Sequence, residues 1–159
     1  MSKEKQCSKA DTYPARILIE GNRSTINDLC GVVATFTDDN LKYKHQDSRT
    51  IAEIIQHIIC SQNCMYLNSF VLGKKTKCNC HTPKTVKEAI KAINGLDPYF
   101  AEVVNSLESE DYQVKFKTEW GQELTKELAL FQSVTHTSYH ISEICFLAGL
   151  GGFYKNTMG

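Results

Sequence analysis

Apolar side chains, with a few small polar ones, recur every three or four residues in four long segments, the spacing that defines one face of an α-helix. In the first segment, from about residue 16 to 40, these positions are Ile17, Leu18, Asn22, Thr25, Ile26, Leu29, Val32, Val33 and Phe36. In the second, from 51 to 73, they are Ile51, Ile54, Ile55, Ile58, Ile59 and Met65. Two further segments, 86–107 and 122–150, follow. The pattern predicts four amphipathic helices, each of which needs a partner for its apolar face.

Two of the predicted helices begin at a capping box, in which a hydroxyl caps the first amides and a glutamate three residues later reaches back. Thr50 and Glu53 have this spacing before the second helix, and Thr85 and Glu88 have it before the third. Gly73 is expected to end the second helix, because glycine is common just past a helix C-terminus.

The third helix is interrupted by the sequence NGLDP at residues 94–98. Asp97 is of a type that caps helices, and Pro98 is tolerated in the first turn of a helix but not in its interior. We therefore expect a kink here, with Asp97 capping the second half of the helix.

Between the third and fourth helices, residues 114–120 alternate between apolar and charged side chains, which predicts a short extended strap. A single extended segment cannot form a sheet, so we expect the strap to cross one end of the helices. The whole pattern predicts an all-α four-helix bundle. We assign residues 16–152 to this single domain, with a loose N-terminal arm at 1–15 and a C-terminal tail at 153–159.

Composition narrows the possible partners and locations. The 159 residues are 42% hydrophobic, enough for one core, and 18 basic residues balance 18 acidic ones. A neutral chain has no electrostatic attraction for nucleic acid or an anionic membrane. No segment has the apolar run of a signal peptide or a membrane span. The seven cysteines are an odd number, and we expect reduced thiols in a cytoplasmic protein.

Three histidines form the strongest chemical pattern. His136 and His140 lie one helical turn apart on the fourth helix, and His57 borders the apolar stripe of the second. Three neutral imidazoles on one divalent ion would leave a coordination position open, which is typical of catalytic rather than structural zinc sites. The alternative interpretation is that these are hydrogen-bonded histidines of the core or its boundary, since a pair with this spacing often arises by chance.

Glu143 follows His140 by three residues and is expected near the same helix face. It could bind the metal, orient an imidazole or act as a general base, and these roles stay open. The alternative is a solvated carboxylate at the edge of the bundle.

The cysteines offer a second, weaker pattern. Cys78, Cys80 and His81 place soft ligands in one basic loop, but the second half of a zinc-finger pattern is missing. Cys60 and Cys64 lie four residues apart on the second helix, and Cys64 lies on the strip that carries the histidine. An exposed loop and inert thiols are the alternatives.

The chain resembles the DinB/YfiT-like family of small four-helix-bundle candidate metalloproteins from about residue 16 to 152. The resemblance rests on a histidine within TIAEIIQHIICS, the pair in HTSYH and the closing FLAGLGG. It implies a bundle of the up-down-down-up type in which His57, His136 and His140 bind one divalent metal. Better understood relatives use zinc or nickel to activate low-molecular-weight thiols for transfer or isomerisation.

The chain departs from this family after the second histidine, where relatives often have Arg-Gly-Gln and this sequence has Ile141, Ser142 and Glu143. The resemblance implies an enzyme in which zinc or nickel, or alternatively iron or manganese, activates a thiol or water. It would act on a small-molecule substrate as a transferase or hydrolase, with Glu143 assisting, and could form a homodimer. The alternative is a non-catalytic metal-binding, ligand-binding or dimerising bundle.

Overall fold

Helices make up nearly all the regular structure of residues 13–75 and 77–155, the part of the chain that the computed structural model describes. The helical segments are α1 (Tyr13–Val33), α2 (Ile51–Cys60) with its wider continuation η3 (Ser61–Val71), α3 (Val86–Asn94), α4 (Leu96–Ser106) and α5 (Lys126–Leu150). Single 3₁₀ turns lie at Asn40–Lys42 and Asp111–Gln113. The predicted all-α four-helix bundle is confirmed, with α3 and α4 as the two halves of its third helix.

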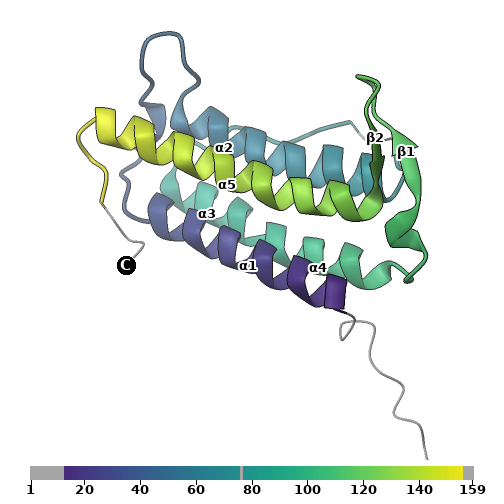
Figure 1. The fold of residues 1–159 in the computed structure, drawn as a ribbon. Helices are drawn as coiled ribbons and strands as arrows, with labels where there is room; N and C mark the ends of the chain where they lie inside the picture. Colours follow the sequence, from purple (N-terminus) through teal and green to yellow (C-terminus); the bar gives the residue numbers. More distant parts are fainter. Residues whose placement is uncertain (1–12, 76, 156–159) are drawn as a thin grey trace, which may run out of the picture.

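The helices follow an up-down-down-up order (Figure 1). The segment formed by α2 and η3 runs antiparallel to α1, the α3–α4 segment runs parallel to α2, and α5 returns alongside α1. Because α2 and α3 point the same way, residues 72–85 must travel back along the bundle before α3 can begin. This long return connection passes beside α2.

The predicted helix starts are largely confirmed. The Thr50 hydroxyl accepts a hydrogen bond from the Glu53 amide, and the Glu53 carboxylate accepts one from the Thr50 amide, which completes the capping box. Thr85 caps α3 through the Glu88 amide, whereas the Glu88 carboxylate accepts from the amide of Lys84 instead. After η3, Gly73 adopts a positive φ of 65°, which ends the helical segment as expected.

The apolar stripe of α2 is buried along its whole length, as its spacing predicts. The core consists of two apolar clusters. One gathers around α2, α3 and the C-terminal half of α1, and the other around η3, α4 and the N-terminal turns of α1. Buried polar side chains are also present in the interior, and Asn22 accepts a hydrogen bond from Gln62 and donates one to Asp97.

Several sequence predictions differ from the structure. The first helix ends at Val33 instead of near residue 40, and Ile17 is 53% exposed although it belongs to the predicted stripe. Phe36 is buried, but from the turn that follows the helix. Asp97 does not cap α4, because its carboxylate accepts from Asn22 and Arg23 of α1.

The expected single strap is a small hairpin. Strand β1 (Lys115–Lys117) pairs antiparallel with β2 (Glu123–Thr125), and Phe116 lies opposite Leu124. The hairpin covers one end of the bundle (Figure 1). The fourth helix therefore begins at Lys126, where Thr125 caps it, instead of at residue 122.

Within the described ranges, no helix is both long and apolar enough to cross a membrane. Residues 1–12 of the expected N-terminal arm and 156–159 of the expected tail lie outside those ranges. Phe153, just beyond α5, packs its ring edge-on against Phe36 and Tyr43.

Candidate metal centre

The three predicted histidines meet inside the bundle. The Nε2 atom of His136 lies 3.2 Å from Nε2 of His57 and 3.2 Å from Nε2 of His140. One ring nitrogen from each of the three lies within 4.8 Å of the others. The sequence prediction that these side chains converge is therefore correct, although they come from positions 79 residues apart.

Packing of α5 against α2 and η3 produces this convergence. His57 lies on the last full turn of α2, at the border of its isoleucine stripe, and His136 and His140 lie one turn apart on α5. His140 is only 4% exposed, whereas His57 and His136 are partly open to solvent. The cluster thus lies at the edge of the core.

His136 and His57 favour the neutral form. Burial is the main cause that lowers the pKa of His136 to about 4, and the electrostatic effects of His140, His57 and Arg49 act in the same direction. Burial is also the main cause that lowers the pKa of His57, with Arg49 and His140 contributing. Neutral imidazoles present nitrogen lone pairs, which are the metal-binding form of histidine.

Glu143 lies next to the cluster and contacts the outer side of one ring. The Nδ1–H of His140 donates to Oε2 of Glu143 over 2.6 Å, and Nη2 of Arg49 lies 3.4 Å from the same oxygen. A proton on Nδ1 leaves the Nε2 lone pair of His140 facing the other two histidines. A carboxylate on the far nitrogen of a ligating histidine fixes the ring and its tautomer in many metal sites.

The donor set matches a single divalent ion. Imidazole nitrogens at about 2.0–2.1 Å from a tetrahedral zinc ion lie about 3.3 Å from each other. The two Nε2 separations of 3.2 Å at His136 are close to this value. The Nε2 atom of His136 can share a proton with only one of its two neighbouring histidines. At its contact with the other histidine, two nitrogen lone pairs then face each other, and a bound cation would relieve that repulsion. The three histidines therefore could hold a metal.

Three further residues lie near the cluster, and Arg49 and Tyr66 among them have no signal in the sequence pattern. Arg49 precedes the capping box in a polar loop, and Ser61 places its hydroxyl 3.4 Å from Nε2 of His57. Tyr66 packs its ring 5.7 Å from that of His136, measured between centroids. Periodicity could identify Ser61, which lies four residues after His57, but Arg49 reaches the site only through the path of its loop.

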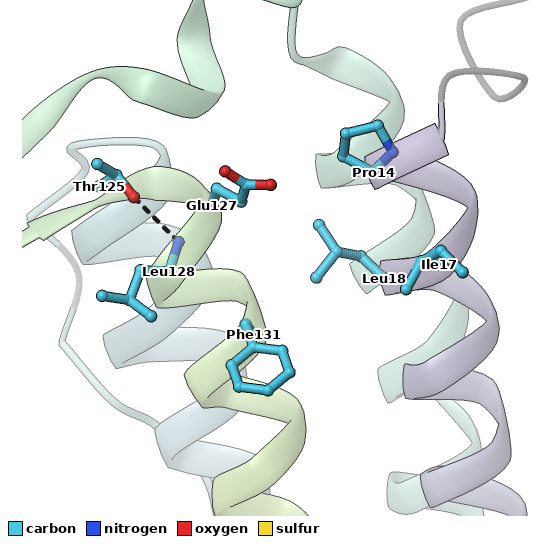
Figure 2. Close-up of a pocket in the computed structure, with 7 residues that line it drawn as sticks. All are labelled: Pro14, Ile17, Leu18, Thr125, Glu127, Leu128 and Phe131. Atoms are coloured by element: carbon cyan, nitrogen blue, oxygen red, sulfur yellow. Dashed lines mark hydrogen bonds between the residues drawn. The ribbon is translucent and has the colours of Figure 1, made fainter.

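A cavity of about 360 Å³ opens beside His57, lined by Arg49, Glu53, Gln56, His57 and Cys60. It combines one cationic, one anionic and one amide side chain with the imidazole, so a small polar molecule could reach the histidine cluster from this side. An apolar hollow of about 320 Å³ lies elsewhere, between the first turns of α1 and α5 (Figure 2). It shares no lining residue with the histidine cluster.

The cysteine prediction is only partly matched. Cys78 and Cys80 do not assemble with His81, which is exposed. Instead their sulfurs meet those of Cys60 and Cys64 from the second helix. Cys64 therefore belongs to a sulfur cluster rather than to the cavity beside His57.

Comparison with known proteins places the chain among small helical bundles. The sequence profile of the DinB superfamily matches residues 22–144, more than half of the chain. A solved structure of a DinB-like protein from Bacillus cereus ATCC 10987 is 14% identical, with a TM-score of 0.69 over 85% of this chain and 91% of that one. No curated protein matches the chain.

A second solved structure is similar along almost the whole chain. YfiT from Bacillus subtilis, described as a probable metal-dependent hydrolase with an unusual four-helix bundle topology, is 17% identical. Its TM-score is 0.71, over 96% of this chain and 94% of that protein. At this identity the similarity establishes a shared fold.

The low pKa of His136 predicts how the stability of the metal-free protein depends on pH. At a pH between about 6.5, the usual pKa of histidine, and about 4, its pKa in the folded protein, the unfolded chain binds a proton that the folded chain does not. The free energy of unfolding should therefore fall as the pH is lowered through this window, and level off below about 4. Replacing His136 with Gln removes the group and should flatten this decline, as measured by urea unfolding from pH 7 to 4.

The matched control for this experiment is His45→Gln, which changes an exposed histidine outside the cluster. It should keep the pH dependence of the unmodified protein. Equal slopes for the unmodified protein and the His136→Gln variant would contradict the prediction.

Proposed function

The chain belongs to the DinB superfamily, and we propose that it is a metal-dependent hydrolase that holds one divalent cation between His57, His136 and His140. The observation that carries this proposal is the convergence of three imidazole nitrogens beside an open cavity. Support also comes from the fold it shares with YfiT, which is described as a probable metal-dependent hydrolase.

Each residue of the cluster has a distinct proposed role. The three imidazoles hold the cation, and zinc or nickel are the first candidates because both suit nitrogen ligands, with iron or manganese as alternatives. Such a cation supplies Lewis acidity, which makes a water or thiol more acidic and polarises a carbonyl group. Glu143 orients His140 through Nδ1, and Arg49 holds Glu143 in place.

The cavity suggests the class of substrate. Arg49 lines it beside His57, so its guanidinium could bind a carboxylate or another anionic group of a small molecule. Glu53 and Gln56 line the same cavity and add an acceptor and an amide. A small polar substrate with one anionic group fits this lining best.

Activation of a low-molecular-weight thiol is the second candidate. The same three-histidine cation would lower the pKa of a thiol as it does that of water, and Arg49 could bind the carboxylate that such thiols carry. A reducing cytoplasm, which contains such thiols, is the location that fits this candidate. An activity assay that is run with and without added thiol distinguishes this candidate from hydrolysis.

The first prediction of this proposal concerns metal content. Protein purified without chelator should contain one more equivalent of divalent metal than a His136→Ala, His140→Ala double variant purified in the same way, as measured by elemental analysis. Activity against a panel of esters, amides and thiol acceptors should vanish with that metal and return when zinc or nickel is added. The control is His45→Ala, which should keep both the metal and the activity.

Two results would contradict different parts of this proposal. Equal metal content in the unmodified protein and the double variant would exclude the histidine site. A metal that is lost in the double variant, combined with no turnover in any of the assays, would favour a non-catalytic metal-binding bundle.

The second prediction concerns Glu143. The variant Glu143→Leu should bind metal about 10–100-fold more weakly, because His140 loses the acceptor that fixes its tautomer. Glu143→Gln should keep most of the affinity, since an amide oxygen also accepts a hydrogen bond. Competition with a chromophoric chelator measures both, and Glu119→Leu on the exposed hairpin turn is the control. If Glu143→Gln is as weak as Glu143→Leu, Glu143 acts through its charge and not through this acceptor.

The third prediction concerns the homodimer expected from the sequence. Large exposed apolar side chains lie along one face of α5, at intervals that match its helical repeat: Leu128, Phe131, Tyr139 and Phe146. We propose that a second copy of the chain covers this face. Light scattering should then give the mass of a dimer, and Phe131→Glu should shift it towards a monomer. Trp120→Glu, at an exposed aromatic residue of the hairpin, should not, and a monomeric unmodified protein would contradict the proposal.

A further inference from the structure

Four cysteines form a second cluster of metal-binding side chains, separate from the histidines. The sulfurs of Cys60, Cys64, Cys78 and Cys80 all lie within 4.8 Å of one another. Within this cluster Cys60 and Cys78 are joined as a disulfide, and Cys64 and Cys80 are free thiols. Two of these residues come from the second helix and two from the return connection.

Local structure explains why the two pairs meet. Cys60 ends α2 and Cys64 lies one turn later in η3, so both sulfurs point from the same face. The return connection runs past this face in the opposite direction, and the alternating spacing of Cys78 and Cys80 turns both sulfurs to one side. This arrangement follows from the up-down-down-up order of the helices, because the connection must pass α2.

The return connection is also held to α2 by hydrogen bonds. The Gln56 side-chain amide donates to the backbone oxygen of Cys80 over 2.7 Å, and the Thr82 hydroxyl donates to Oε1 of Gln56. Cys80 further packs against the apolar cluster around α2. The position of Cys80 therefore does not depend on the sulfur contacts alone.

We propose that in the reduced protein these four cysteines bind one zinc ion as a structural tetrathiolate site. Tetrahedral zinc holds sulfur at about 2.3 Å, which places the four sulfurs about 3.8 Å apart. The four observed sulfurs lie within 4.8 Å of one another, and once the Cys60–Cys78 bond is reduced these two sulfurs would separate to the distance that zinc requires. A thiol or phosphine reductant first supplies the two electrons and two protons that convert the Cys60–Cys78 disulfide to two thiols. Binding of zinc then converts four thiols to thiolates and releases four protons, with no further change of oxidation state.

A disulfide alone leaves half of the cluster unexplained. Linking Cys60 to Cys78 uses two sulfurs, whereas Cys64 and Cys80 would remain as free thiols in the same small volume. A zinc ion accounts for all four. Closed coordination by four protein ligands is also what distinguishes a structural zinc site from the open three-histidine cluster.

Nearby charge supports a site of this kind. Zinc with four thiolates has a net charge of minus two. Lys74, Lys75 and Lys77 precede Cys78 on the same connection, and all three are exposed. This connection is therefore basic within a neutral chain, and positive charges close to a tetrathiolate zinc would offset part of its negative charge.

The site would fix one wall of the cavity beside the histidines. Cys60 lines that cavity together with His57 and Gln56, and Gln56 is bonded to the connection. A zinc ion joining Cys60 to the connection would therefore keep residues 78–82 against α2. Its role is to hold the shape of the cavity, without contact with the substrate.

Zinc analysis of protein purified with a phosphine reductant and without chelator tests this proposal. One equivalent of zinc should remain in the His136→Ala, His140→Ala variant and should disappear in Cys64→Ser and in Cys80→Ser. Cys145→Ser, which changes a half-buried free thiol outside the cluster, should keep it. The two kinds of site are therefore lost in different variants, and failure of one does not imply failure of the other.

A measurement on the unmodified chain covers the case in which the cysteine variants do not fold. Cobalt(II) replacing the zinc should produce an intense thiolate-to-cobalt absorption in the near ultraviolet, which the histidine cluster cannot produce. A mercurial that binds thiols should abolish this absorption.

The proposal is overturned if the reduced protein holds no zinc beyond the histidine-dependent equivalent and gives no thiolate-to-cobalt absorption. It is also overturned if alkylation and mass spectrometry find the Cys60–Cys78 disulfide intact under the same reducing conditions.

Discussion

The packing of α5 against α2 and η3 is the interaction on which the histidine cluster depends, because neither helix alone carries all three rings. The face that α5 turns inward changes in character along its length. Leu130 and Ile144 are fully buried in the two apolar clusters, whereas Ser133, Thr137 and His140 lie between them. These three buried polar residues contribute less to stability than apolar residues would, because each buried polar group needs a hydrogen-bond partner. The bundle keeps its histidines in the region where its core is least apolar.

The second helix contributes residues to both the histidine cluster and the cysteine cluster, and its geometry changes in the middle. Regular α-helix ends at Cys60, and wider turns follow from Ser61 to Val71. Such wider turns are rare and are often found at functional sites, where they shift side chains relative to the regular repeat. Here the change begins at Ser61, so His57 and Cys60 lie on the regular helix and Cys64 lies on the wider turns. His57 contacts His136 of α5, whereas Cys60 and Cys64 meet the cysteines of the return connection. The second helix therefore lies between the histidine cluster and the cysteine cluster.

The parts of the fold that the sequence predicts are those with strong local patterns. The isoleucines of α2 repeat so regularly that their burial follows from spacing, and the Thr50 capping box is a complete local signal. Phe36 is buried after the chain has left α1, and no periodicity reveals where a chain turns. Residues 123–125 are too few and too polar to predict as a strand. Asp97 has a capping side chain, but bonds from Asn22 and Arg23 on a distant helix take its carboxylate.

The site itself was predictable where its residues share a helix and unpredictable where they meet through a loop. The spacing of His136, His140 and Glu143 follows from the helix, whereas the presence of Arg49 and Tyr66 required the structure. Arg49 also bears on the expectation, taken from the resemblance, that an arginine follows the second histidine. Ile141 occupies that position and is 6% exposed, so a charged side chain there would have to be buried or displaced. Here the guanidinium comes from the loop before α2 and binds Glu143. Arg49 and Glu143 thus pair with each other, and removing either one alone would leave the other without its ionic partner beside the histidines.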